Sequence, residues 1–311
     1  MLHPSPIKLV ILIFAALLLS ACNGETPSPT GISQPTAQSA EATNTPAILP
    51  TATPTPEPTA TPVPLAAVVN GESITLAEFE AELSRYQTSA QETGTNLATN
   101  PQQVVLDEMI NQLLLSQSAR QQGFVVDEAA LQARVDSLTT QLGGGQALLD
   151  WITAYGYTEV DFRQALRRSV EAAWMRDQIT AGIATTAEQV HARQILLYNS
   201  DQANQVYNQL QSGNDFAALA ADYDPQTQGD LGWFPRGYLT QPALDEAAFS
   251  LEPGQYSPVI ETELGFHILQ VIEKDPQHAL TPDARLALQI LALQDWLTQH
   301  RSESTIEILL P

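Results

Sequence analysis

Cysteine and positive charge are both scarce in this sequence. Its 311 residues include one cysteine, Cys22, so neither an internal disulfide nor a cysteine-based metal site can form. Lysine occurs only at Lys8 and Lys274, and the formal net charge is -22 at pH 7. A chain this acidic is not expected to bind nucleic acid or to dock electrostatically on an anionic membrane.

Motifs for metal, phosphate and nucleophilic chemistry are lacking as well. The five histidines show no His/Glu or Cys/His spacing typical of zinc sites. The run Gly143-Gly144-Gly145 has no following lysine, as a phosphate-binding loop would, and lies between helical patterns, so it predicts a linker. We therefore expect no metal and no cofactor.

The start of the chain predicts export and lipidation. Residues 9–19, LVILIFAALLL, form an apolar run of signal-peptide length, too short to span a bilayer as a free helix. Leu19-Ser20-Ala21-Cys22 follows and resembles a bacterial lipobox, which predicts a signal peptide over 1–21 and acylation of Cys22. The alternative is an ordinary secretory cleavage site beside a chance cysteine. The expected location is extracytoplasmic, lipid-anchored to the bacterial membrane on its outer face or facing the periplasm.

Residues 22–64 are rich in proline, threonine and serine and show no apolar periodicity. Nothing in this stretch can offset the entropy lost on ordering, so we expect a disordered spacer. At about 3.1 Å per residue it would reach on the order of 130 Å from the membrane.

Residues 65–184 are expected to form a helical domain. Asn70-Gly71 predicts a tight turn, and Thr75-Leu76-Ala77-Glu78 has the spacing of a helix capping box. Further helices are predicted to begin at Asn100-Pro101, Asp127 and Thr158.

The last segment, 278–311, is expected to return to this helical domain. Thr281-Pro282 predicts the start of an apolar helix, which must bury its face against another element. The tail from Thr305 to Leu310 alternates weakly, as a strand would, and we expect it to pair with Ala66–Val69.

The segment between these parts, 185–277, carries the functional motifs. Asp215-Phe216 predicts a helix start, GDLGWF occupies residues 229–234, and GFHI occupies 265–268. In this order the motifs resemble the parvulin-type peptidyl-prolyl cis/trans isomerases. The layout of the whole chain resembles the extracytoplasmic foldases of the PrsA and SurA type. The resemblance implies an α+β fold, a helical chaperone-like domain into which a parvulin domain with a four-stranded antiparallel sheet and surrounding helices is inserted.

The resemblance also implies site residues. The proline ring is expected in an apolar pocket lined by four residues: Leu231, Phe234, Leu239 and Leu244. The polar groups of the catalytic site are expected at four positions: His267, Thr262, Asp224 and Gln194. Plain core packing for the apolar residues, and turn capping for Asp224, are the alternative interpretations.

Three departures from the family pattern bear on activity. The histidine expected on the opening strand is Gln194, and His191, three residues earlier, points to the opposite sheet face. Leu264 replaces a hydroxyl, and the loop 225–228 is shorter than usual. Loss of one hydrogen bond, roughly 0.5 to 1.5 kcal/mol, corresponds to about tenfold or less in rate, so the sequence predicts reduced but measurable activity.

Three functions fit these observations. The first is a membrane-anchored prolyl isomerase that assists the folding of exported polypeptides containing X-Pro bonds. The second is a holdase chaperone whose parvulin domain grips such chains with little or no turnover. The third is an envelope scaffold, indicated only by the spacer and the acidic composition.

Overall fold

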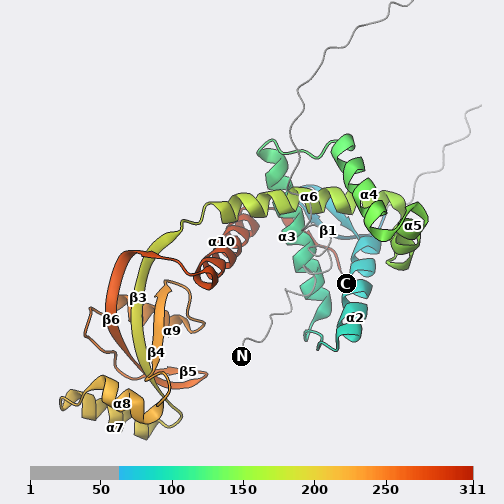
Figure 1. Cartoon of the computed structure of the whole chain (residues 1–311). Coiled ribbons are helices and arrows are strands. Elements are labelled where there is room, and N and C mark those ends of the chain that lie inside the picture. Colours follow the sequence, from blue (N-terminus) through green and yellow to red (C-terminus); the bar gives the residue numbers. More distant parts are fainter. Residues whose placement is uncertain (1–62, 311) are drawn as a thin grey trace, which may run out of the picture.

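The computed structural model describes residues 63–310, which form two lobes (Figure 1). The predicted signal segment, Cys22 and nearly all of the spacer lie outside the described residues. The N-terminal lobe contains residues 65–181 together with the C-terminal helix and strand, and the second lobe contains residues 186–279.

The N-terminal lobe opens with a β-hairpin. Strands β1 (Leu65–Val69) and β2 (Glu72–Thr75) pair antiparallel. The turn residues Asn70 and Gly71 have φ of 52° and 84°, the left-handed conformation that this tight turn requires. On the other side of β1 lies β7 (Ile306–Ile308), also antiparallel. The tail therefore pairs with the first strand, as the sequence predicts.

Side-chain caps set the start of most helices in this lobe. The predicted capping box is present, because Thr75 Oγ1 accepts from Glu78 N and Thr75 N donates to the Glu78 carboxylate at 2.8 Å. The caps at Asn100, Asp127 and Thr158 also accept a backbone N–H each. The helices are α2 (Leu76–Thr93), α3 (Pro101–Gln121), α4 (Glu128–Leu142), α5 (Gly145–Ala154), α6 (Glu159–Ala181) and α10 (Pro282–Glu303).

Apolar packing ties the C-terminal helix to this lobe. The hairpin, α2 and α3 share one buried cluster, and α4, α5 and α6 share another. Leu293, Trp296 and Leu297 of α10 pack on the cluster formed by α3 and α6, which includes Ala172 and Met175. Helix α10, near the C-terminal end of the chain, thus completes the core of the N-terminal lobe.

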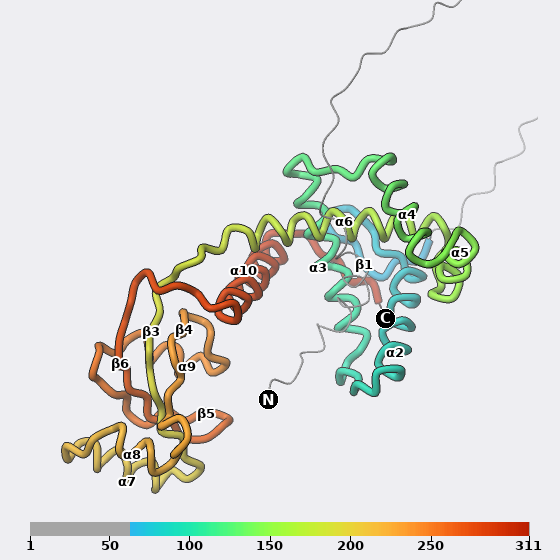
Figure 2. Tube along the Cα trace, viewed as in Figure 1, coloured from blue at the N-terminus to red at the C-terminus, as the bar shows by residue number. Residues whose placement is uncertain are grey.

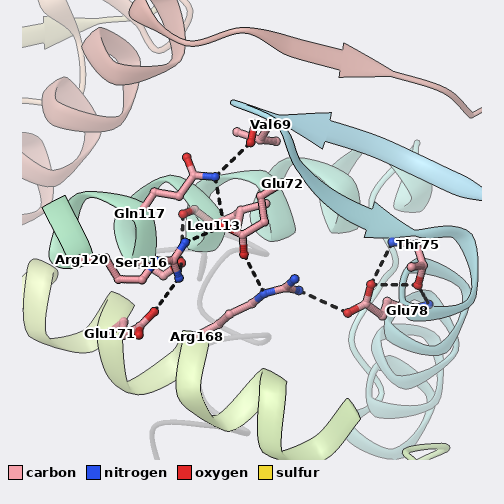
Figure 3. A network of polar contacts seen from close by, with 10 residues as sticks. All are labelled: Val69, Glu72, Thr75, Glu78, Leu113, Ser116, Gln117, Arg120, Arg168 and Glu171. Atoms are coloured by element: carbon pink, nitrogen blue, oxygen red, sulfur yellow. Dashed lines mark hydrogen bonds and ion pairs between the residues drawn. The ribbon is translucent and has the colours of Figure 1, made fainter. Parts of the chain in front are cut away.

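A polar network joins the hairpin to α3 and α6 (Figure 3). Glu72 on β2 accepts a hydrogen bond from Arg120 at 2.5 Å and lies 3.5 Å from Arg168 Nε. Arg120 also binds Glu171, whose side chain is 0% exposed, at 2.7 Å. Arg168 reaches Glu78 at 3.2 Å. Removing one member would leave a buried charge unpaired, so the network fixes α6 against the hairpin.

The second lobe is built on an antiparallel sheet with the strand order β4-β3-β6-β5. The long strands β3 and β6 lie at its centre, and the short strands β4 and β5 form its edges. The bounds are β3 (Thr186–Leu197), β4 (Asp230–Pro235), β5 (Ile260–Thr262) and β6 (Gly265–Ala279).

Helices cover both faces of this sheet. Helices α7 and α8 pack on Ile195, Leu197 and Ile268, and we call this side the α7/α8 face. Helix α9 packs on Val190 and Leu269, and we call this side the α9 face. The helices are α7 (Ser200–Gln211), α8 (Phe216–Tyr223) and α9 (Pro242–Ser250).

The chain passes between the lobes twice (Figure 2). It leaves the N-terminal lobe at the end of α6 and enters β3, and it returns from the end of β6 into α10. The second lobe is therefore inserted between two parts of the first. None of the helices within residues 63–310 is both long and apolar enough to cross a membrane.

Candidate active site

The α9 face carries the histidine of the GFHI block. His267 on β6 lies opposite Leu196 of β3, and Gln194 lies opposite Leu269. Leu269 packs in the cluster under α9, so the alternation of side chains along a strand places Gln194 and His267 on this same face. His267 is only 2% exposed. The strands thus hold a buried imidazole beside a side-chain amide.

Side chains from three strands form one hydrogen-bonded chain. Thr262 Oγ1 on β5 lies 2.9 Å from His267 Nε2, and His267 Nδ1 lies 2.9 Å from Gln194 Oε1. The backbone N–H of Leu264 donates to Thr262 Oγ1 at 3.1 Å. Three of the four sequence-predicted polar residues are therefore in contact. The amide of Gln194 occupies the position at the second ring nitrogen of His267.

The surroundings favour a neutral imidazole. Burial lowers the pKa of His267 below its ordinary value, because an imidazolium ion would lose its hydration here. The neighbour on each side of the ring, Gln194 and Thr262, is uncharged. A neutral imidazole has one donor nitrogen and one acceptor nitrogen, which matches the two hydrogen bonds that the ring makes.

Asp224, the fourth predicted polar residue, lies in a different network at the end of α8. Its carboxylate accepts from the N–H groups of Gln226 and Thr227, both at 3.2 Å, and from the Thr227 hydroxyl. The Thr227 hydroxyl first, and then these backbone N–H groups, hold the pKa of Asp224 below its usual range. Within residues 63–310 no hydrogen bond joins Asp224 to His267. The geometry is that of a carboxylate capping a turn.

Gly229 connects this turn to the site. Its N–H reaches the Asp224 carboxylate at 3.4 Å, and its carbonyl accepts from Gln194 N at 2.8 Å. Its φ is 74°, and a Cβ at this position would lie 2.0 Å from the carbonyl oxygen of Gln194. Only glycine permits this approach. Gly229 opens the GDLG block in the sequence, but the motif gives no sign of this contact with Gln194.

The four predicted pocket residues gather on the α9 face. Phe234 and Leu244 belong to the buried cluster, and Leu231 and Leu239 pack against it while remaining partly exposed. Phe234 is 0% exposed, so it supports the set from beneath rather than contacting a ligand directly. Of the four predicted pocket residues, Leu231 and Leu239 are therefore the two that a ligand could contact.

The loop between β4 and α9, which carries Leu239, is held at its base. Gly237 N donates to Asp245 Oδ1 at 2.8 Å. Burial raises the pKa of Asp245, and this hydrogen bond opposes the rise. The loop also touches the other lobe, because a Cβ at Gly237 would lie 2.7 Å from Cδ1 of Leu291 on α10.

His191 lies on the α7/α8 face, as strand alternation requires, since its neighbours Val190 and Ala192 are in the cluster under α9. Its Nε2 lies 2.9 Å from Asp230 Oδ1, which also accepts from Gly232 N at 2.8 Å. His191 therefore braces the GDLG block from behind. Within residues 63–310 no group of three or more His, Cys, Asp or Glu side chains is arranged to hold a metal ion.

Comparison with known families finds matches to two parts of the chain. A family model described as a PPIC-type PPIase domain (Rotamase) matches residues 183–273, and one described as a SurA-like N-terminal domain matches residues 61–146. The foldase protein PrsA of Caldanaerobacter subterraneus is 29% identical over 232 residues, which cover 66% of this chain and 72% of that protein. The chain is a PrsA/SurA-like foldase with a parvulin-type peptidyl-prolyl isomerase domain.

A second relative and a solved structure match this foldase over different shares of its length. The chaperone SurA of Burkholderia pseudomallei is 33% identical over 144 residues, which are 40% of this chain and 32% of that protein. Among solved structures, PrsA from Bacillus cereus has 20% identity and a TM-score of 0.43, and the match covers 76% of this chain and 88% of that one.

Proposed function

We propose that the parvulin domain binds X-Pro segments of unfolded exported polypeptides on its α9 face and rotates the imide bond there. The observation that carries this proposal is the Gln194–His267–Thr262 hydrogen-bonded chain, which lies on the same sheet face as Leu231 and Leu239. Together these residues offer apolar surface for a proline ring and oriented polar groups for the imide.

The chemistry needs little more than this. Rotation about a peptide C–N bond faces a barrier of about 18–20 kcal/mol, and for X-Pro bonds it takes roughly tens of seconds unaided. A site that grips the ring, removes water from the imide and binds the twisted form better than the planar forms lowers this barrier without a covalent step. Leu231 and Leu239 would contact the ring, with Phe234 and Leu244 behind them.

The proposed location is the outer surface of the bacterial membrane, with the chain held by acyl groups on Cys22. The support is the apolar run at 9–19 and the Leu-Ser-Ala-Cys motif that follows it. Incorporation of labelled fatty acid into the wild type, and its absence in Cys22→Ala, is the expected result. Equal labelling of both proteins would contradict the anchor.

A holdase is the second candidate, and a separate observation favours it. On α10 the side chains of Leu286 and Ile290, one turn apart, are 54% and 41% exposed. Exposed apolar side chains on one helix stripe are suited to holding unfolded segments. The contact between Leu291 and Gly237 brings this helix next to the loop that carries Leu239.

A protease-coupled assay with an X-Pro peptide, alongside an aggregation assay with an unfolded client, separates the two functions. We expect the full chain to accelerate isomerisation above the buffer rate. The double variant Leu286→Ser/Ile290→Ser should keep this activity while suppressing aggregation less well. Turnover of the wild type equal to buffer, with intact suppression of aggregation, would leave the holdase and exclude the isomerase.

A further inference from the structure

The side-chain amide of Gln194 is bonded at one end only. Its oxygen accepts from the His267 ring at 2.9 Å. Among the hydrogen bonds within residues 63–310 none uses its nitrogen, and this nitrogen is not one of the buried polar atoms that lack a partner. The NH2 group therefore reaches solvent on the α9 face. It is an oriented donor with its hydrogens free.

The rest of the chain fixes this orientation. An amide oxygen can only accept, so His267 Nδ1 must carry the ring proton. In the neutral ring Nε2 then accepts, and the Thr262 hydroxyl is its donor at 2.9 Å. Leu264 N in turn donates to Thr262 Oγ1. In each hydrogen bond of the series the donor and the acceptor are therefore fixed.

Protonation of His267 would disturb this series of hydrogen bonds. A protonated His267 would need Thr262 to turn its hydroxyl toward the carbonyl of Gly265, which is 3.4 Å away, and would place a charge on a ring that is 2% exposed. Within residues 63–310 the ring forms no ion pair, and its two side-chain hydrogen-bond partners are uncharged. Arg193 lies over Phe216 on the α7/α8 face, and Glu261, opposite Phe266, is on that face too.

The other nearby carboxylates are engaged or exposed. Asp224 is bound by its own turn, Asp245 on α9 binds Gly237 N, and Glu263 is an exposed residue of the turn after β5. The buried imidazole is thus surrounded by uncharged partners, and burial favours its neutral form.

Rotation of an X-Pro bond creates a new acceptor. In the planar imide the nitrogen lone pair is shared with the carbonyl, whereas in the twisted form it is localised on the prolyl nitrogen. A donor aimed at that nitrogen binds the twisted form only, which is the requirement for catalysis.

We propose that Gln194 is the catalytic donor to the prolyl nitrogen of the twisted imide, and that the uncharged hydrogen-bonded series it forms with His267 and Thr262 holds it in place. This inference rests on the isomerase function proposed above and assigns the residue that contacts the reacting atom. The glutamine is then a donor that does not titrate, where a histidine would change charge near neutral pH.

The test is kcat/KM of the full chain as a function of pH, from the ordinary histidine pKa of about 6.5 upward, for the wild type, Gln194→Glu and Gln194→His. Gln194→Glu keeps the shape and the acceptor for His267 but has no N–H, so activity should fall about three- to tenfold. The wild type should vary less than about twofold with pH, and Gln194→His should acquire a titration near the ordinary histidine pKa of about 6.5. Gln209→Glu on α7, an exposed position, is the matched control and should equal the wild type.

The protonation state of His267 can also be measured directly, without any variant. Nitrogen NMR of His267 in the wild type should show the neutral Nδ1–H tautomer throughout this pH range. Two results would overturn the role of Gln194 while leaving the proposed isomerase function intact. One is protonation of the His267 ring near neutral pH, and the other is full activity of Gln194→Glu when the wild type is also active. An inactive wild type would overturn the proposed isomerase function and this inference with it.

Discussion

We expect Glu108 on α3 to make the stability of the N-terminal lobe depend on pH. Burial raises the pKa of its carboxyl from an ordinary value of 4.5 to about 7, with Arg176 lowering it, Glu82 raising it and Arg301 lowering it. In the unfolded chain the carboxyl ionises at its ordinary value. Folding therefore favours the protonated form of Glu108.

The sign and size of the effect follow from linkage. Below about pH 4.5 the carboxyl is protonated in both states and costs nothing. As pH rises toward about 7, the unfolded state releases the proton and the folded state retains it, so stability falls. At about 1.4 kcal/mol for each tenfold step, the full loss above pH 7 is on the order of 3 kcal/mol.

Glu108→Gln removes this dependence. By urea unfolding, followed by tryptophan fluorescence, the variant should be more stable than the wild type by on the order of 3 kcal/mol at about pH 8 and nearly equal to it at about pH 4.5. The exposed Glu80→Gln on α2 is the control and should change stability by less than about 0.5 kcal/mol. A difference between Glu108→Gln and the wild type that does not grow with pH would refute the reasoning.

Three further variants test other parts of the structure. Gly229→Ala cannot keep its φ or its approach to Gln194, so it should lower isomerase activity at least about tenfold, and unchanged kcat/KM would show that the contact is not needed. Arg120→Met leaves Glu171 buried and unpaired, so the urea midpoint should fall by the equivalent of about 3 kcal/mol; a loss below about 1 kcal/mol would contradict the network's role. Leu231→Ser should raise KM for X-Pro peptides severalfold without altering the melting temperature, whereas a lowered melting temperature with unchanged KM would make it a core residue.

Local features of the structure follow well from the sequence. The Asn70-Gly71 turn and the helix caps at Thr75 and Asn100 depend on residues next to one another, and all are present. The pairing of the tail with β1 could be expected from an apolar helix that had to return to its own domain. Helix α7 lies outside the helix starts predicted above, although Asn199 caps it and Val206 is one of its regularly spaced buried residues.

Features that depend on contacts between distant segments were less predictable. Spacing placed Asp224 before the GDLG block but could not show that its carboxylate turns into its own loop. The exposure of Phe234 is decided by how α9 covers the sheet, which no local pattern encodes. The contact of Gln194 with His267 depends on the register of β3 against β6, and two residues 73 apart in sequence give no local sign of it.

The most direct test of the account is exchange NMR of an X-Pro peptide in the presence of the full chain. The account predicts that cis/trans exchange, which takes roughly tens of seconds unaided, becomes fast enough for exchange cross-peaks. The same titration should shift the resonances of Leu231, Leu239 and His267 and leave those of α7 unchanged. Peptide exchange at the unaided rate, or shifts confined to the α7/α8 face, would contradict it.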